Sequence, residues 1–350
     1  MMKNIFNNLL LKLLPARLNS FFKKADFIWL IHPLETKDIT SRYRFLKLVP
    51  TGMMIRLLNL LPPLILAPIT GLKDVEGKDF NGYLIGCFLL PDQIRRDQPL
   101  VKRKIYSAAK ISSKLDSRIL GIGGIIVVDA EFEKKVKKNY HVVLANGTAT
   151  ACVIMHARIE RILLKNNKKF NDLSLAIINS TSLKGRLLSR FWSNFAFKEI
   201  LLLGRNFDHL NKLRRETNRS DIKISTQIQD IRKYDLVIVA PSYNRIDFQV
   251  DYFRDDMIIY DINDPKYDFN EIIETYSNIQ IYSNGLINTQ DVNYHYDLGI
   301  PSNCSQVCLT ETFLLARVRE ARQSYFNEVA LNQVHQIQET FFNSNFFLID

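Results

Sequence analysis

The sequence predicts an α/β fold, with a doubly wound parallel sheet in its second half and a separate α/β domain before it. Two observations predict this fold: short apolar runs recur along the chain, and segments with helical spacing separate them. A strand that is apolar throughout is buried on both faces, as in a parallel sheet covered by helices on each side. In the second half, the predicted strands are 175–178, 199–203, 222–225, 236–240 and 257–260.

The helices of the second half are predicted between these strands, near 184–191 and 207–215. The first half alternates less regularly. Its predicted strands are 27–31, 64–69, 83–90 and a run that ends at 121–124, and its predicted helices are 36–48, 53–61 and 91–115. Pro91 and Asp92 suit the start of the last of these helices.

A length of 350 residues suits about two domains, and the polar run 165–169 suggests the boundary between them. We therefore expect four parts. They are a basic amphipathic helix at 1–25, an N-terminal α/β substrate domain at 26–165, a Rossmann-like nucleotide domain at 166–300, and C-terminal helices at 301–350 that pack back on the N-terminal domain.

Composition and charge exclude several classes of protein. Four cysteines without a CxxC pair are too few for a disulfide scaffold or a zinc module, and the six histidines are dispersed, so we expect no metal site. No apolar run reaches the roughly 18 residues of a membrane span. The net charge is +11, but the basic residues are scattered and no nucleic-acid motif appears. The expected location is the cytoplasm.

Residues 1–25 differ from the rest of the chain. Five Lys and Arg residues precede the first acid, Asp26, and apolar residues recur at helical spacing. This pattern is typical of a helix on an anionic membrane surface or on a partner, and equally of a helix docked on its own domain. A cleavable signal fits less well, because polar residues interrupt the apolar run.

A nucleotide site in a doubly wound sheet requires a tight turn after the first strand, where glycines let the backbone approach a pyrophosphate. Here the turn is Asn179-Ser180-Thr181-Ser182-Leu183-Lys184-Gly185, so only the third position of a G-x-x-G-x-x-G rhythm is glycine. Asn179 tolerates positive φ, and Ser182 offers a hydroxyl while its Cβ narrows the approach. Ala240, at the end of the fourth strand, completes this predicted edge.

The end of the second strand carries Gly204-Arg205-Asn206, where a ribose-binding residue belongs. An acidic residue there would favour an unphosphorylated 2′-hydroxyl, whereas a guanidinium favours a phosphate. If a nicotinamide cofactor binds, we expect NADPH. An exposed arginine at a strand end is the alternative interpretation.

Cys308 is predicted at or near the start of an apolar-striped helix. A thiol at a helix N-terminus is activated because the backbone amides stabilise its thiolate. A lone cysteine is also commonly an inert buried residue. Cys304, four residues earlier, would share a helix face with Cys308 only if the helix began early.

From about Asp26 to Phe342 the chain resembles the long-chain acyl-[acyl-carrier-protein] reductases, which convert fatty acyl thioesters to fatty aldehydes. The resemblance rests on the order and spacing of several segments. They are Phe27-Ile-Trp-Leu-Ile-His-Pro33, Leu61-Pro-Pro63, Ile69-Thr-Gly-Leu72, Gly82-Tyr-Leu-Ile-Gly86, Gly121-Ile-Gly-Gly124, Leu201-Leu-Leu-Gly-Arg-Asn206, Asp297-Leu-Gly-Ile-Pro301 and Val307-Cys-Leu-Thr-Glu-Thr-Phe-Leu-Leu315.

The resemblance implies that Cys308 accepts the acyl group from an acyl-carrier-protein or coenzyme A thioester, and that NADPH then reduces it to aldehyde. Glu311 matches an acidic position of the family and would either orient or deprotonate the thiol, or serve a helix start. The segments matching the family's substrate region predict substrate-binding residues at Gly123, Gly124, Asn146, Thr148 and Thr150.

The chain departs from the family pattern at Asn179 and Ser182, at Ala145-Asn-Gly147, and at Asn284-Gly285. The alternative function is therefore a catalytically weak or inactive acyl-binding relative at a membrane surface. The charge fits either function, because a basic face such as 102–104 or the lysines of 134–138 would attract an acidic carrier protein.

Overall fold

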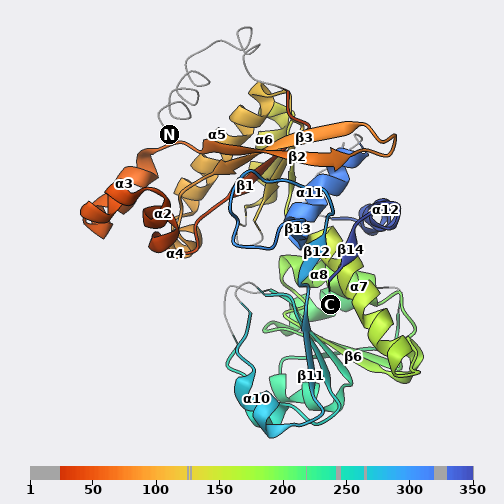
Figure 1. Cartoon of the computed structure of the whole chain (residues 1–350). Coiled ribbons are helices and arrows are strands. Elements are labelled where there is room, and N and C mark those ends of the chain that lie inside the picture. The colour runs from red at the N-terminus through yellow and green to blue at the C-terminus, as the bar shows by residue number, and fades with distance from the viewer. Residues whose placement is uncertain are drawn as a thin grey trace. The chain divides into compact units, whose positions relative to one another are not determined.

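The computed structural model describes residues 24–349, apart from 124–125, 127, 218, 242–245, 264–265 and 319–328 (Figure 1). The predicted helix at 1–25 therefore lies almost wholly outside the described residues. The chain forms two compact units. Unit 1 comprises 1–150, 286–329 and 336–350, and unit 2 comprises 151–285 and 330–335. The domain boundaries expected from the sequence were 165 and 300.

Unit 1 contains a five-stranded sheet of order β2-β3-β1-β4-β5. Its strands are β1 (Phe27–Ile31), β2 (Leu64–Lys73), β3 (Asp79–Gly86), β4 (Ile119–Ile122) and β5 (Val143–Ala145). β2 runs antiparallel to β3, and the other neighbours are parallel. β1 lies in the middle because its apolar sequence is suited to burial on both faces.

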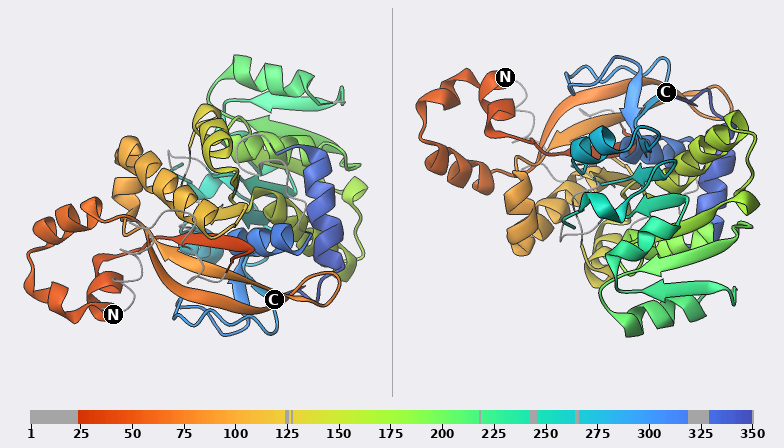
Figure 2. Two further views of the ribbon diagram at one scale, coloured as in Figure 1. Left: turned by 90° about the horizontal axis from the view of Figure 1, so that it is seen from above. Right: turned by 90° about the horizontal axis from the view of Figure 1, so that it is seen from below.

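Helices cover both faces of this sheet. α5 (Gln98–Lys114) and α6 (Ala130–Tyr140) pack on the face formed by the even-numbered residues of β1 and β4 (Figures 1 and 2). α11 (Val307–Arg317) packs on the other face, where Gly121 leaves room: a Cβ there would lie 2.0 Å from Thr312 Oγ1. The C-terminal segment thus packs on the strands of the N-terminal segment.

Several elements of unit 1 differ from the expectation. The segment predicted as one helix at 91–115 is two, α4 (Pro91–Arg96) and α5, because the Asp97 side chain caps α5 by accepting a hydrogen bond from Leu100 N at 3.0 Å. The predicted helix at 36–48 is α2 (Thr36–Arg42) followed by a 3₁₀ turn, η2 (Arg44–Leu48). α3 (Thr51–Leu60) follows.

A small antiparallel sheet, which the sequence does not predict, leads into α11. Its order is β13 (Cys304–Gln306), β12 (Leu286–Asn288) and β14 (Phe347–Leu348). α12 (Leu331–Phe342) precedes β14. Strands of two or three residues carry no periodicity that a sequence reading can detect.

Unit 2 contains a six-stranded parallel sheet of order β8-β7-β6-β9-β10-β11. Numbered from β6, this is the order 3-2-1-4-5-6 of the Rossmann fold, so the doubly wound prediction is confirmed. The strands are β6 (Ser174–Ile178), β7 (Glu199–Leu203), β8 (Ile222–Ser225), β9 (Leu236–Val239), β10 (Ile258–Asp261) and β11 (Gln280–Ser283). β11, at the edge of the sheet, is the one strand of the six that was not predicted. The sequence reading missed it because every residue is only half-buried.

The connections of unit 2 include α8 (Leu183–Trp192), α9 (Phe207–Arg215) and α10 (Asn270–Thr275), with short 3₁₀ turns η3 (Phe170–Asp172), η4 (Ile228–Lys233) and η5 (Val250–Tyr252). α7 (Thr148–Lys165) leads from β5 of unit 1 into this unit. Among the described residues, none of the helices combines the length and hydropathy needed to cross a bilayer.

Candidate functional site

Cys308 lies in the first turn of α11, at the position predicted for it. β13 runs directly into this helix, with Gln306 as the N-cap residue. The thiol is half-buried, and its Sγ lies 3.8 Å from Gln306 Oε1. The other three cysteines are buried, and burial raises the pKa of Cys87 to about 11. Cys304 belongs to β13, so the two thiols do not share a helix. Exposure and helix position therefore favour Cys308 as the reactive thiol.

Glu311, one turn further along α11, is fully buried and binds the start of another helix. Its Oε1 accepts hydrogen bonds from Gly147 N at 2.8 Å and Asn146 N at 3.3 Å, and its Oε2 accepts one from Thr150 N at 3.0 Å. These amides belong to the loop after β5 and the first turn of α7. The carboxylate thus compensates the positive end of α7. Of the two roles expected for Glu311, the contacts match service to a helix start, and the helix is α7.

The loop between β5 and α7 packs directly on Cys308. Gly147 has φ +82°, and a Cβ at this position would lie 2.4 Å from Cys308 Cα. Asn146 Oδ1 accepts hydrogen bonds from Thr148 N at 3.1 Å and Thr148 Oγ1 at 2.5 Å, which closes the turn. Only glycine combines this backbone conformation with this close approach.

The predicted substrate residues gather at one edge of the unit 1 sheet, where β4 and β5 end. Asn146, in the loop after β5, and Thr148 and Thr150, in the first turn of α7, are all buried. Gly123 follows β4, and a Cβ there would lie 3.7 Å from the His32 ring. Gly124 lies outside the described residues. The edge therefore places Gly123 and the 146–150 segment at the ends of neighbouring parallel strands.

In unit 2, the turn after β6 begins with a residue in the left-handed conformation and leads into α8. Asn179 has φ +57°, so the expected left-handed conformation is confirmed. Its Nδ2 donates to Ala240 O at 3.0 Å, which joins the turn to the end of β9. A Cβ on Gly185 would lie 2.1 Å from Asn179 O, so α8 approaches β6 this closely because residue 185 is glycine.

The hydroxyl residues of this turn have different environments. Ser180 is fully buried, and its Oγ lies within hydrogen-bond distance of Leu203 O (2.7 Å) and Ile177 O (3.0 Å), so it ties β6 to β7. Ser182 is the N-cap of α8, and its Oγ accepts from Gly185 N at 3.1 Å. Thr181 is half-buried beside Gly204.

Arg205 follows β7 and is exposed, next to the turn that holds Thr181. Asn206 is the N-cap of α9, and its Oδ1 accepts from His209 N at 2.9 Å. Asn206 therefore stabilises a helix start, while the guanidinium of Arg205 faces solvent at the carboxyl edge of the sheet.

These residues fit a dinucleotide at the start of α8. The turn keeps the left-handed first position and the glycine at the third, and the helix presents its positive end at the sheet's carboxyl edge. Thr181 and Ser182 would hold the pyrophosphate, and Arg205 would hold the 2′-phosphate of an NADP-type cofactor. The Cβ of Ser182 stands where a second glycine would allow closer approach.

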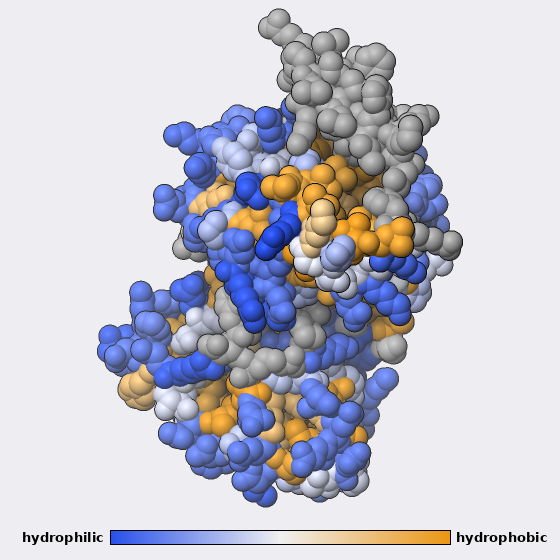
Figure 3. Space-filling model, turned by 90° about the vertical axis from the view of Figure 1, so that its left-hand side faces the viewer, coloured by the Kyte–Doolittle hydropathy of each residue, from blue (hydrophilic) through white to orange (hydrophobic). Residues whose placement is uncertain are grey.

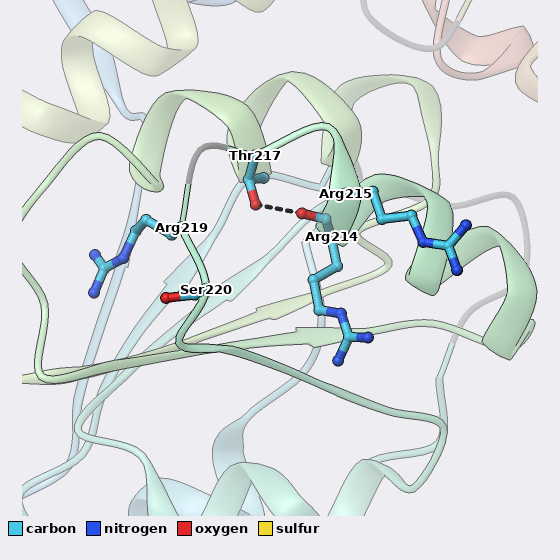
Figure 4. Close-up of a pocket in the computed structure, with 5 residues that line it drawn as sticks. All are labelled: Arg214, Arg215, Thr217, Arg219 and Ser220. Atoms are coloured by element: carbon cyan, nitrogen blue, oxygen red, sulfur yellow. Dashed lines mark hydrogen bonds between the residues drawn. The ribbon is translucent and has the colours of Figure 1, made fainter.

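A basic hollow of about 500 Å³ lies elsewhere in unit 2 (Figure 4). Arg214, Arg215, Thr217, Arg219 and Ser220 line it, between the end of α9 and the start of β8. It thus lies at the amino end of a strand, away from the carboxyl edge where nucleotides bind. The guanidinium of Arg219 is already bound by Asp221, Phe195 O and Phe197 O, so we assign the hollow no part in the cofactor site.

Sequence reasoning missed Gly147, Tyr294 and Arg158. Tyr294 is buried and donates to Cys304 O at 2.7 Å, which fixes β13 just before Cys308, and burial raises its pKa. Arg158 donates to Ser283 O at 2.6 Å at the end of β11. The sequence showed Gly147 only as part of a departure from the family pattern, and the positions of all three residues depend on contacts between residues far apart in sequence.

The expected basic faces differ in exposure. Within 102–104, Lys104 is buried, and its Nζ donates to Leu58 O at 3.0 Å and also to Leu61 O, so this run is not a continuous basic face. Lys102 pairs with Asp129. The exposed lysines of α6 remain as a basic strip. They are Lys134, Lys135, Lys137 and Lys138.

No protein-family model matches the chain, and no curated protein sequence matches it. Solved structures match at low similarity. Quinate dehydrogenase from Corynebacterium glutamicum in complex with NAD has a TM-score of 0.41 and 11% identity, covering 91% of this chain and 99% of its own. A chorismate mutase/shikimate 5-dehydrogenase fusion protein from Clostridium acetobutylicum has a TM-score of 0.39 and 9% identity, covering 91% of this chain and 97% of its own. L-tryptophan dehydrogenase from Nostoc punctiforme has a TM-score of 0.39 and 11% identity, covering 92% of this chain and 81% of its own. Such distant likenesses do not bear on activity.

Proposed function

We propose that the protein is an NADPH-dependent reductase that takes the acyl group of a long-chain acyl thioester onto Cys308 and releases it as an aldehyde. The observation that carries the proposal is the half-buried thiol in the first turn of α11, packed against Gly147. The Rossmann order of unit 2 and the position of Arg205 support a nucleotide cofactor. The thioester substrate rests on the resemblance of the sequence to acyl-[acyl-carrier-protein] reductases.

The chain's own residues account for the first step. The positive end of α11 stabilises the Cys308 thiolate, which attacks the thioester carbonyl. The same end favours the negative charge that develops on the carbonyl oxygen. The carbon–sulfur bond to the carrier breaks, and the carrier leaves as a thiolate that takes up a proton. Cys308 then holds the acyl group as a new thioester.

The second step reduces this thioester. NADPH, which the turn 179–185 and Arg205 would hold, would supply the hydride for this reduction. Cys308 would then carry the thiohemiacetal as its alkoxide; its carbon–sulfur bond breaks, so the aldehyde leaves and Cys308 returns as thiolate. One thioester, one NADPH and one proton thus give one aldehyde, one carrier thiol and one NADP⁺. Glu311 positions the Gly147 loop throughout, because its carboxylate binds the loop's amides.

The test is capture of the acyl group by mass spectrometry. A long-chain acyl thioester incubated without cofactor should add the acyl mass to the peptide that contains Cys308. Cys308→Ala should lose both labelling and turnover while keeping its affinity for NADPH. Cys304→Ala is the matched control, since this thiol is buried in β13, and it should still be labelled. Labelling that persists in Cys308→Ala would refute the proposal.

One observation favours the alternative of an acyl-binding protein without turnover. The side chain of Ser182 occupies the middle position of the phosphate loop and caps α8 itself. A titration with NADPH separates the two functions, because the reductase requires binding at micromolar cofactor. Failure to bind at about 1 mM NADPH, the upper limit of the usual KM range, would favour the alternative.

A further inference from the structure

A second feature of unit 1 lies in the segment between Leu34 and Leu61. Of the twelve large hydrophobic side chains exposed among the described residues, six fall in this segment. They are Leu34 (66% exposed), Leu48 (89%), Met53 (57%), Leu57 (47%), Leu60 (77%) and Leu61 (42%). Single exposed apolar residues are common, but a gathered set marks a binding surface.

The gathering follows from the geometry of α3. Met53, Leu57 and Leu60 are spaced by four and three residues, so they lie on one face of the helix. The opposite face already provides the contacts that folding needs, because Met54 and Leu58 are buried against Ile39 and Phe88. A surface helix requires one apolar stripe, and α3 has a second one that faces solvent.

α3 is firmly attached, so the outer stripe is not the result of a loose helix. The buried Lys104 donates to Leu58 O and Leu61 O at the end of α3, and Arg103 Nη2 donates to Asn59 O at 3.2 Å. Gln93 Nε2 donates to Asn59 Oδ1 at 2.8 Å. Cationic side chains at a helix C-terminus also stabilise it through the helix dipole.

After Asp38 the charged residues of this segment are all basic, whereas Glu35 and Asp38, next to Leu34, are exposed acids. Lys37, Lys47 and Arg56 are exposed, and Arg56 lies on the same face of α3 as Leu60. No acidic residue occurs between Asp38 and Asp74. Figure 3, which looks at the side that carries α2 and α3, shows apolar residues gathered on the upper part of this face with strongly hydrophilic residues among them.

We propose that α3 and its flanking turns form a docking surface for an anionic lipid bilayer. Leu48, Met53, Leu57 and Leu60 would enter the boundary between headgroups and acyl chains, while Lys47 and Arg56 contact the anionic headgroups. Exposed apolar side chains of η2 and α3 with the cations Lys47 and Arg56 among them match the combination that an anionic bilayer interface binds, since the interface offers acyl chains and negative headgroups together. None of the residues of this surface belongs to the basic segment 1–25, and the proposal does not depend on the proposed reductase activity.

The test uses the full chain and vesicles of phosphatidylcholine with roughly one third phosphatidylglycerol, compared with phosphatidylcholine alone. The protein should sediment with the anionic vesicles and be released by about 0.5 M salt, which screens the headgroup charge. Leu48→Asp with Leu60→Asp should weaken binding by about tenfold or more. Leu164→Asp, at a leucine that is 70% exposed on α7, is the matched control and should bind like the parent.

A spectroscopic variant locates the contact. Leu57→Trp should shift its fluorescence to shorter wavelength on anionic vesicles and be quenched by brominated lipid chains, because the natural Trp29 and Trp192 are buried. Three results would overturn the proposal. They are equal binding by the double Asp variant and the parent, vesicle binding without a change at position 57, and a dimer that the double Asp variant converts to a monomer, which would identify a second copy as the occupant.

Discussion

The backbone amides at the starts of α7 and α8 donate to different kinds of side chain. α7 begins against the carboxylate of Glu311, which is buried and accepts from three backbone amides. α8 begins at Ser182, whose neutral hydroxyl accepts from Gly185 N. A carboxylate compensates the positive end of a helix, whereas a hydroxyl satisfies one donor and leaves the charge uncompensated. The start of α7 is therefore committed to internal structure, and that of α8 keeps the electrostatics of an anion site.

The largest effect is expected from breaking the α7 closure. Glu311→Gln keeps the shape but replaces the charge and turns an amide group toward backbone donors. We expect a loss of about 2–4 kcal/mol in the free energy of unfolding, since a buried charged acceptor with three donors is lost. Urea unfolding checks this prediction. Glu339→Gln, at an exposed glutamate of α12, should change stability by less than about 0.5 kcal/mol. A Glu311→Gln protein as stable as the parent would contradict the assigned role.

The second largest effect is expected from the contact between Gly147, in the loop before α7, and Cys308. Gly147→Ala should cost about 1–3 kcal/mol in stability, because of positive φ and the 2.4 Å approach to Cys308 Cα, and it should slow acylation of Cys308. Gly77→Ala is the matched control, since Gly77 has φ +80° with nothing near its Cβ position. It should show the strain alone and leave acylation unchanged. Equal acylation rates for both variants would separate Gly147 from the reactive site.

A third prediction places a carboxylate at the start of α8, as Glu311 does at the start of α7. Ser182→Asp should preserve stability, because Asp is a good N-cap residue, while weakening NADPH binding about 10–100-fold by charge repulsion. Ser182→Gly, which restores the middle glycine, should bind NADPH at least as tightly as the parent. Isothermal titration measures both affinities. Unchanged binding by Ser182→Asp would mean that no phosphate lies at the start of α8.

The smallest effect concerns the choice of cofactor. Arg205→Glu should weaken NADPH binding about tenfold and leave NADH binding nearly unchanged, because the guanidinium would contact only the 2′-phosphate. Arg215→Glu, at an exposed arginine near the other end of α9, controls for a general change of charge. If both variants lose NADPH affinity equally, Arg205 is a surface arginine and does not read the ribose.

The sequence predicts most of the unit 2 sheet because β6, β7, β9 and β10 are apolar over most of their length. It predicts the conformation of Asn179 because asparagine tolerates positive φ. β11 escaped because Gln280-Ile-Tyr-Ser283 is half polar at a sheet edge. The break between α4 and α5 escaped because helical spacing continues across Asp97.

The candidate site was harder to predict than the sheet. The helix start at Cys308 follows from local pattern, as expected. The partners of Glu311 lie more than 160 residues earlier in the chain, and nothing local indicates that its carboxylate closes α7 instead of the helix it belongs to. The burial of Lys104 was not predicted for the same reason, because a run of three basic residues is typical of an exposed face.

The small sheet before Cys308 has a consequence for folding during synthesis on the ribosome. β12 pairs both with β13, which leads into the Cys308 helix, and with β14 at Phe347–Leu348. A ribosome makes all six strands of the Rossmann sheet before it reaches either partner of β12. The six-stranded sheet of unit 2 can therefore form during translation before β12 has either partner, and the surroundings of Cys308 are completed late.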